Sequence, residues 1–345
     1  MKNKPWINVL FQIGALLLAL LITSLLLIIG GAPPLKAYLS IIKGSFGTFQ
    51  NVMTVLIAWS PLLLTTAGVL VTFAAGLWNI GMEGQITMGA IFTAGLLRLL
   101  QETSLPPALI ITLGILAGIL GGAIWAALVG VLKTFGGVNE IFGGLGMNFV
   151  ASALTLYLVF GPWKRPGVAS MSGTQPFDKS LWLPGIFHTE LSPITLVLSI
   201  LAIFLVFILL RGTHFGLRLK AVGKNPRAAF LMGIPAWQYS IFAFLLCGAL
   251  AGLTGALQVT GQYHRLLPNI SSGYGFLGLM VAMLVNYQAL WAAPVALFFA
   301  AINTGGLQLQ IWYKLPFSFS GVLQDLLVLL VLLGEGVRQR LVGKE

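Results

Sequence analysis

A polar segment, "GLWNIGMEGQITMGA" over residues 76–90, interrupts a long apolar region. It places Asn79, Glu83 and Gln85 close together along the chain, among four glycines. If the segment is helical, Asn79 and Glu83 share one face, because they are four residues apart. A carboxylate in an apolar setting is costly and normally faces a pathway or a partner. The segment therefore predicts the lining of a polar path. The alternative is a short turn that leaves Glu83 in water.

A second polar segment, "GGVNEIFGGLGMNF", begins at Gly136. Asn139 and Glu140 open an apolar helical run, and an acid in a first turn interacts well with the helix dipole. Capping alone would explain these two residues. Asn148 lies two turns further on, inside the run, where an amide needs a hydrogen-bond partner or a wet cavity. We expect Asn139, Glu140 and Asn148 to join the first segment in lining the path.

A third segment, "GKNPRAAFLMGIP", reads as a complete short helix. Asn225 is a good N-cap, Pro226 suits the first helical position, and Gly233 suits a left-handed residue just past the end. Seven helical residues span only about 10 Å, too little to cross a bilayer. A helix this short is marginal alone, so we expect it to dock on a partner. The alternative is a helix lying on lipid headgroups.

Several chemistries find no support in the sequence. The Gly223–Lys224 pair lacks the Ser or Thr and the upstream Gly of a Walker A loop, so we expect no ATP site of that kind. One cysteine, Cys247, and three scattered histidines offer no disulfide or metal-ligand spacing. No nucleophile–base arrangement stands out among the eight acids. We therefore expect no enzymatic activity, no metal and no cofactor in this chain.

Composition decides which elements position these residues. The chain has 345 residues, of which 58% are hydrophobic and only 8% charged. Soluble domains carry about a quarter charged residues, so this chain cannot cover a soluble surface. The composition predicts an all-α, polytopic membrane protein that has membrane lipid as a partner. The net charge of +11 is then better explained by membrane topology than by nucleic-acid binding.

About ten segments are apolar enough to be transmembrane helices, given that a span needs about 20 residues. They cover residues 8–30, 52–75, 85–100, 108–132, 140–160, 192–210, 237–260, 273–286, 290–306 and 319–337. The third and the eighth are short, so eight full spans plus re-entrant segments is the alternative. The first run is too long for the core of a signal peptide, so we expect a retained span.

The charge distribution orients this single transmembrane domain, residues 1–345. Arg211 to Arg227 contains five basic residues and no acid, so residues 211–236 are expected to form a cytoplasmic loop. Ten spans then leave both termini in the cytoplasm and residues 161–191 in an extracytoplasmic loop. Small residues at four-residue spacing predict close helix packing in the fourth and seventh spans. They are Gly114, Gly118 and Gly122, and Gly248, Gly252 and Ala256.

The three polar segments, in this order, resemble the permease subunits of bacterial ABC importers for nucleosides and simple sugars, within the wider branched-chain amino acid and ribose permease superfamily. "GLWNIGMEGQITMGA", "GGVNEIFGGLGMNFVA" and "GLRLKAVGKNPRAAFLMGI" resemble family blocks, and "LAGLTGALQVTG" and "GYGFLGLMVAML" follow in the expected places. The resemblance covers nearly the whole chain after the first span. It departs at Arg227, where the family commonly has an acid, at Phe230, and in "VNYQALWAAP".

The resemblance implies a translocation subunit of the bacterial cytoplasmic membrane with no cofactor of its own. The capped helix would couple it to a separate ATP-binding cassette ATPase, which would bind ATP and magnesium. The residues that match this coupling pattern or lie within it are Gly223, Lys224, Asn225, Pro226, Arg227, Ala228, Ala229 and Gly233. Further partners would be a second permease, either a paralogue or a second copy, and an extracytoplasmic solute-binding protein.

The implied cargo is a small polar solute, with a nucleoside first and a simple sugar such as ribose second. An ion-coupled secondary transporter is the alternative function. That transporter would need titratable groups in mid-span, for which only Glu83, Glu140 and Asp325 are available. It would also leave the capped helix without a role. Sequence alone does not select the solute, or decide between a homodimeric and a heterodimeric pore.

Overall fold

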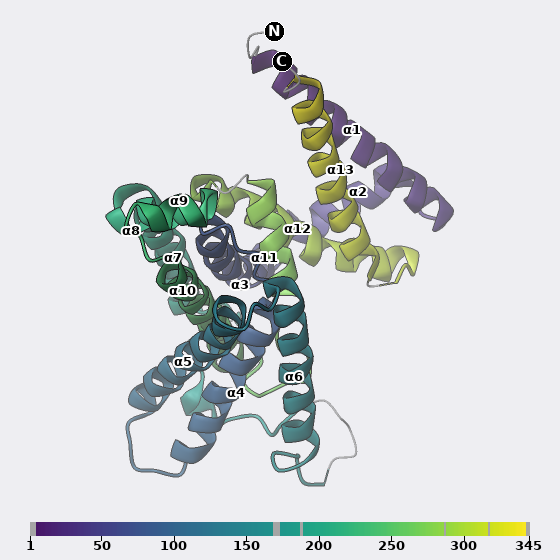
Figure 1. Cartoon of the computed structure of the whole chain (residues 1–345). Helices are drawn as coiled ribbons and strands as arrows, with labels where there is room; N and C mark the ends of the chain where they lie inside the picture. The colour runs from purple at the N-terminus through teal and green to yellow at the C-terminus, as the bar shows by residue number, and fades with distance from the viewer. Residues whose placement is uncertain (1–4, 168–172, 187–188, 286–287, 317, 343–345) are drawn as a thin grey trace. The chain divides into compact units, whose positions relative to one another are not determined.

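The computed structural model describes residues 5–167, 173–186, 189–285, 288–316 and 318–342, and these are helical with connecting turns and no strand (Figure 1). The chain divides into two compact units, residues 1–58 with 297–345, and residues 59–296. The helices are α1 (Pro5–Ile29), α2 (Pro34–Phe46), α3 (Phe49–Ala74), α4 (Met82–Leu100), α5 (Pro107–Thr134), α6 (Glu140–Phe160), α7 (Pro193–Gly212), α8 (His214–Lys224), α9 (Pro226–Leu231), α10 (Ala236–Leu257), α11 (Tyr274–Leu284), α12 (Ala289–Tyr313) and α13 (Ser318–Val342).

The first unit packs α1, α2 and α13 with the second half of α12. Its core is formed by Leu27, Ala32, Ala37, Ile41, Leu309, Leu315 and Leu323. A left-handed Gly31, with φ of +82°, turns the chain sharply between α1 and α2, whose axes differ by 103°. The sequence did not predict α2. Its lysines and glycine break the apolar pattern that would predict a helix. Pro34 suits the first helical position, but it can be recognised as a helix start only when the preceding turn is known.

The second unit is built on a seam of small residues where α4, α5 and α10 meet. A Cβ atom added to Gly118 of α5 would lie 2.8 Å from Cβ of Ala256 on α10 and 3.0 Å from the carbonyl oxygen of Gly89 on α4. Thr93 on α4 also donates a hydrogen bond to the Gly114 carbonyl oxygen, at 2.9 Å. Backbones approach this closely only where side chains are small. The prediction that these glycines pack helices is confirmed.

Residues 173–183, the described middle of the loop predicted over 161–191, fold back onto the segment that follows α10. Phe177 N–H donates to the His264 carbonyl oxygen at 2.9 Å, and Leu183 N–H donates to that of Thr260 at 2.9 Å. The Trp182 ring stacks on His264 with centroids 3.8 Å apart. Burial lowers the pKa of His264, so its ring is neutral at pH 7. The 161–191 range also includes residues 168–172 and 187–188, which lie outside the described residues.

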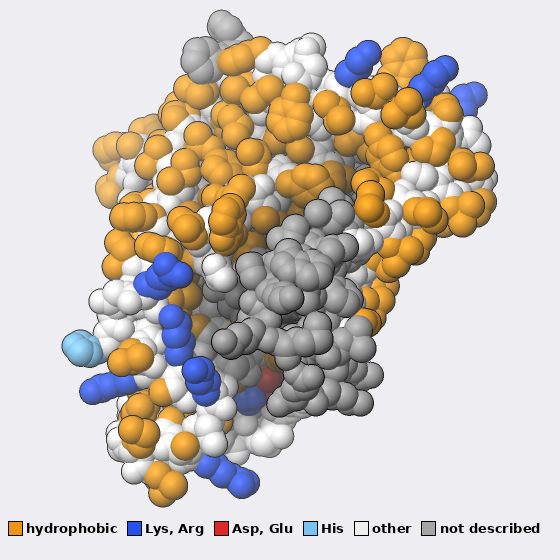
Figure 2. Space-filling model, turned by 90° about the horizontal axis from the view of Figure 1, so that it is seen from above, with side chains coloured by type: hydrophobic (Ala, Val, Ile, Leu, Met, Phe, Trp, Pro, Cys, Tyr) orange, Lys and Arg blue, Asp and Glu red, His pale blue; other side chains and the backbone are white. Residues whose placement is uncertain are grey.

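Apolar surface is abundant outside these cores. Hydrophobic side chains cover much of the surface seen in Figure 2. Six of the described helices are long and apolar enough to cross a membrane, or seven if the bent α1–α2 pair counts as one span. The short third and eighth predicted segments correspond to α4 and α11, and neither is among those six. An all-helical, multi-pass membrane fold is thereby confirmed.

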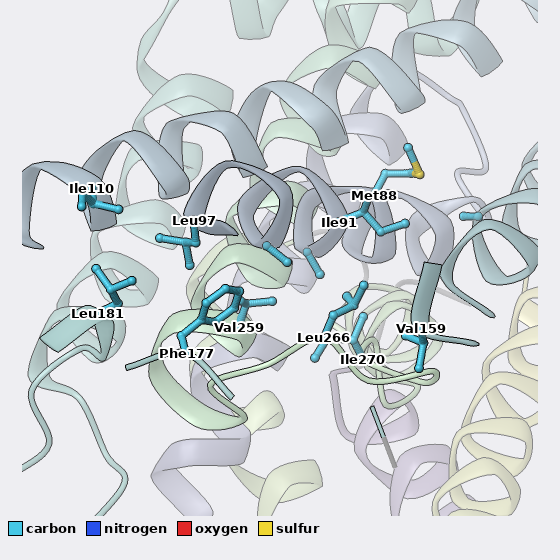
Figure 3. Packing of buried hydrophobic residues seen from close by; sticks show 13 residues of the cluster. Met88, Ile91, Leu97, Ile110, Val159, Phe177, Leu181, Val259, Leu266 and Ile270 are labelled. Atoms are coloured by element: carbon cyan, nitrogen blue, oxygen red, sulfur yellow. The ribbon is translucent and has the colours of Figure 1, made fainter. Parts of the chain in front are cut away.

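A single apolar cluster supports the site described below. It fixes α4 against α5, α6 and the residues around Phe177, Val259, Leu266 and Ile270. Figure 3 shows Phe177 and Val259 facing Leu97 of α4 from below. Because Phe177 is only 5% exposed, the loop contributes to the core rather than lying on a lipid interface. The part of α4 from Met88 to Leu97 is therefore packed in this cluster, and the first turn of the helix leads out of it toward the site.

Candidate functional site

The polar groups gather where the chain breaks between α3 and α4. Residues 75–81 form turns rather than helix, and a left-handed Gly76, with φ of +71°, begins the break. A non-glycine residue would be strained at that φ. The break turns Asn79 into the protein, where its side chain is fully buried. Gly76 and Gly81 therefore serve a non-helical connection, whereas Gly84 and Gly89 lie inside α4. Because Asn79 precedes α4, it does not share a helical face with Glu83.

Asn79 and Gln85 form a reciprocal amide pair. Asn79 Nδ2 donates to Gln85 Oε1 at 3.0 Å, and Gln85 Nε2 donates to Asn79 Oδ1 at 3.0 Å. Asn79 Nδ2 also donates to Sγ of Cys247 on α10, at 3.0 Å. Both amides are fully buried, so the partners satisfy groups that would otherwise be costly inside the protein. Cys247 was not predicted to take part, since a lone cysteine gives no signal in the sequence.

Asn148 ties α6 to the same break. Its Oδ1 accepts from Gly84 N–H at 2.8 Å, and its Nδ2 donates to the Ile80 carbonyl oxygen at 3.0 Å. Gly84 N–H is a donor that the first turn of α4 leaves without a helical partner, and Ile80 lies in the turn before the helix. The close approach depends on a glycine pair, because a Cβ on Gly144 would lie 2.7 Å from Gly81 N. The partner that the sequence required for Asn148 is thus the backbone of the break itself.

Glu83 joins the first turn of α4 to the start of α11. Its Oε1 accepts from Phe276 N–H at 3.0 Å. A Cβ on Gly275 would lie 2.8 Å from that Oε1, so the two helix ends are in tight contact. Glu83 is half-buried rather than free in water, which disfavours the solvated-turn alternative.

Asn139 and Glu140 lie at the start of α6 and make different contacts. The exposed Asn139 caps the helix, accepting from Ile141 N–H at 2.9 Å. Glu140 pairs with Lys133 of α5 and accepts a hydrogen bond from the Trp78 backbone. The structure therefore places Asn79, Glu83, Gln85 and Asn148 around one helix break, in three separate sets of hydrogen bonds, and places Asn139 and Glu140 at its edge. In this conformation, the residues at the edge have the capping and pairing contacts of an ordinary helix start.

The capped helix α9 forms as its sequence predicts. Asn225 Oδ1 accepts from Ala228 N–H at 3.0 Å, Pro226 is the first helical residue, and Gly233 has φ of +78°. The helix spans Pro226–Leu231, one residue shorter than predicted. Ala228 is exposed, whereas Ala229 is 3% exposed and packs within the chain. Ala229 therefore holds α9 in place and offers no contact surface of its own.

An apolar tip projects from the end of α9. It consists of Phe230, Leu231 and Met232, which are 68%, 86% and 80% exposed. Three adjacent large apolar side chains at this exposure, beside a fully capped helix, are typical of a surface that contacts another protein or a membrane. The segment that leads to the tip carries exposed basic residues. Figure 2 shows Lys and Arg side chains in a row along one edge of the face viewed. The basic residues of this segment are Arg211, Arg218, Lys220, Lys224 and Arg227.

The segment that carries α9 touches the polar break directly. A Cβ on Gly76 would lie 2.8 Å from the Gly223 carbonyl oxygen, and one on Gly223 would lie 2.8 Å from Gly76 N. Gly76 opens the break that leads to Asn79, and Gly223 lies next to the last residue of α8. A displacement of α8 and α9 would therefore be transmitted through backbone contact to the buried amides. The sequence contained both glycines but no signal that they meet.

The chemistry open to this site is hydrogen bonding. Its members are amides, one carboxylate and backbone groups, and no three His, Cys, Asp or Glu among the described residues lie close enough to hold a metal ion. Such a set can bind or pass a polar solute. It can also hold a helix break rigid.

Comparisons with known proteins show which family the chain resembles. The family model for the permease component of branched-chain amino acid transport systems matches residues 51–334. A glucose ABC transporter permease of Haloferax volcanii is 28% identical, over 98% of this chain and 90% of its own length. A nucleoside ABC transporter permease of Lactococcus lactis is 26% identical, over 88% and 85%. A guanosine ABC transporter permease of Bacillus subtilis is 24% identical, over 96% and 95%.

Proposed function

The chain belongs to the family of permease components of branched-chain amino acid transport systems. We propose that it is the membrane subunit of an ABC importer and that its solute is a nucleoside, with a simple sugar as the second candidate. It is a multi-pass protein of the cytoplasmic membrane. The relatives named for nucleosides, guanosine and glucose support a neutral polar solute. A network dominated by neutral amides suits such a cargo, since no full charge on the solute has to be balanced.

The observation that carries the proposal is the capped helix α9 with its apolar tip. A separate ATP-binding cassette ATPase, which binds ATP and magnesium, would receive the tip in a groove. The permease itself then needs no nucleotide site, in keeping with the lack of a Walker A loop. An ion-coupled transporter would leave an exposed apolar tip without a role. For that reason the ATP-driven importer is the function we propose.

The polar network supports the translocation path in this proposal. Secondary transporters hold their solute sites at broken helices near the membrane midplane, and a broken helix could serve an ATP-driven importer in the same way. The break between α3 and α4 has that character, and Asn79, Gln85 and Asn148 hold it together through side-chain and backbone bonds. Glu83 would orient or gate the path. Because ATP hydrolysis by the partner drives transport, no proton transfer by Glu83 is needed.

Co-purification and a solute panel test the function. We expect an ATP-binding cassette ATPase to copurify with the tagged permease from its native membrane, together with any paralogous permease. Binding of labelled adenosine, guanosine, uridine, ribose and glucose by the cognate extracytoplasmic binding protein then identifies the cargo, and uptake by the reconstituted complex should show the same preference. Uptake that follows a proton or sodium gradient without ATP would instead support secondary transport.

The ten-span topology gives a second prediction, because it places the exposed Lys224 in the cytoplasm. We expect cysteine at position 224, in a Cys247→Ser background, to react with a membrane-impermeant thiol reagent in inside-out vesicles but not in intact cells. Serine keeps a hydroxyl that can accept the Asn79 hydrogen bond. Labelling from outside intact cells would contradict this orientation and the cytoplasmic placement of both termini. The end residues 1–4 and 343–345 lie outside the part of the chain that the structure describes.

A further inference from the structure

The amphipathic helix α2 presents three distinct faces. One face is buried within its own unit, where Ser45 Oγ donates to the Ala301 carbonyl oxygen at 2.6 Å. A Cβ on Gly44 would lie 3.2 Å from the Cα of Gly305, so α2 and α12 are in backbone contact there. The other two faces are exposed, and they differ in chemistry.

The second face of α2 is an apolar stripe. Its residues lie at helical spacing and are 74%, 48%, 56% and 52% exposed: Leu35, Leu39, Ile42 and Phe46. A stripe of this size on a helix of a multi-pass membrane protein is expected to contact lipid acyl chains. The helix is 13 residues long, or about 20 Å, which suits an element lying along a membrane interface.

The third face borders a groove between α2 and the end of α12. The groove has a volume of about 540 Å³, and its lining residues are Lys36, Leu39, Ser40, Lys43, Gly44, Asn51, Gln308, Trp312 and Tyr313. The two lysines lie seven residues apart, on one side of α2. Leu39 belongs to both the groove and the apolar stripe, so the basic groove opens directly onto the surface expected to face lipid.

The groove carries uncompensated positive charge. No Asp or Glu occurs in the sequence before Glu83, and α12 contains none. Among the residues that the structure describes, neither Lys36 nor Lys43 forms an ion pair. The groove also contains a Trp and a Tyr side chain, the residues that concentrate at the headgroup level of membranes. Cationic, aromatic and apolar groups thus meet in one place.

We propose that this groove binds an anionic glycerophospholipid. The phosphate lies between the ammonium groups of Lys36 and Lys43, and the acyl chains run along the stripe that begins at Leu35 and Leu39. Basic pockets between membrane helices bind anionic headgroups in this way. The adjoining apolar stripe favours a lipid over an acidic protein segment or a free anion, because neither of those would cover it.

The test uses the purified full-length permease in a neutral detergent. Native mass spectrometry measures binding of phosphatidylglycerol and of phosphatidylcholine with identical acyl chains. We expect the parent to prefer phosphatidylglycerol, and K36Q/K43Q to bind it about 25-fold more weakly, or about 5-fold for each lysine. K36R/K43R, which keeps both charges, should bind as the parent does. The exposed pair in K164Q/K179Q is the matched control and should also leave binding unchanged.

Two results would overturn the proposal. One is equal retention of phosphatidylglycerol by the parent and by K36Q/K43Q, with thermal melting showing that the variant is folded. The other is displacement of the lipid by glycerol 3-phosphate at matched concentration, because the groove would then recognise a free anion and the acyl chains would contribute nothing. Loss of binding in K164Q/K179Q equal to that in K36Q/K43Q would show a general charge effect and would likewise contradict the site.

Discussion

Leu231→Asp is expected to reduce solute uptake at least tenfold while the permease inserts into the membrane at its normal abundance. Leu231 is 86% exposed at the end of α9, so the substitution costs the isolated permease little. In the complex, the aspartate would enter an apolar contact and lose its hydration. Centrally placed apolar contacts at interfaces are worth about 2 kcal/mol or more, which corresponds to roughly 30-fold in affinity.

Three measurements separate lost docking from a folding defect. These are copurification of the ATPase, substrate-stimulated ATP hydrolysis and permease abundance by blotting. Leu105→Asp is the control, since Leu105 is an exposed leucine in the loop between α4 and α5, away from α9. It introduces the same charge and should leave ATPase recovery unchanged. Normal ATPase stimulation in Leu231→Asp would show that α9 does not dock the ATPase.

The choice of residue depends on the structure. The sequence places Ala228 and Ala229 side by side as small residues suited to close docking. In the fold, Ala229 is buried, so Ala229→Trp would disturb the permease itself and its effect would be ambiguous. Ala228 is exposed, and Ala228→Trp keeps the steric test without that defect. Phe230, which departs from the family pattern, forms part of the apolar tip.

Local chemistry explains which elements the sequence predicts well. The ends of α9 follow from an N-cap at Asn225, proline at the first position and glycine at a positive φ, all of which act within a few residues. Long apolar runs predict spans for a similar reason, and α6 begins and ends where its run does. Helix α2 escaped prediction because its stability comes from packing on α12, which is nearly 260 residues away along the chain.

The polar network shows the corresponding limit for the site. The sequence identified Asn148 as an amide in need of a partner and predicted that Asn79 and Gln85 line a polar path, but it did not indicate which groups these amides contact. Cys247 lies 168 residues from Asn79, and the carbonyl oxygen bonded by Asn148 belongs to Ile80, 68 residues away. Residue type reveals the need for a hydrogen bond, whereas only tertiary structure reveals which group meets it.

Contact between Gly76 and Gly223 gives the proposed coupling a physical route. The ATPase would act on α9, which follows α8 after the single residue Asn225. Gly223 near the end of α8 is in backbone contact with Gly76, and only two residues, Leu77 and Trp78, separate Gly76 from Asn79. Because glycine backbones meet here without side chains between them, movement of α8 shifts the break directly. The buried amide pair would then respond to events at the ATPase.

Glu83→Leu is expected to lower uptake much more than Glu83→Gln. Glu83 accepts a hydrogen bond from Phe276 N–H and lies in tight contact with Gly275, and so joins α4 to α11. Glutamine keeps an oxygen acceptor of the same reach but removes the charge, so part of the network survives. Leucine removes every acceptor. The Phe276 N–H then loses its acceptor, and a donor left unpaired inside the protein costs about 1–3 kcal/mol.

The comparison requires uptake of labelled solute at matched permease abundance, with melting temperature recorded for both variants. Solute binding by the separate extracytoplasmic protein should be the same with either variant, because the substitution lies in another chain. If Glu83→Gln transports at a useful fraction of the parental rate and Glu83→Leu does not, the carboxylate acts through its hydrogen bonds at the helix junction. If both lose transport equally while remaining folded, the negative charge itself is required. Parental uptake by Glu83→Leu would show that the junction between α4 and α11 has no part in translocation.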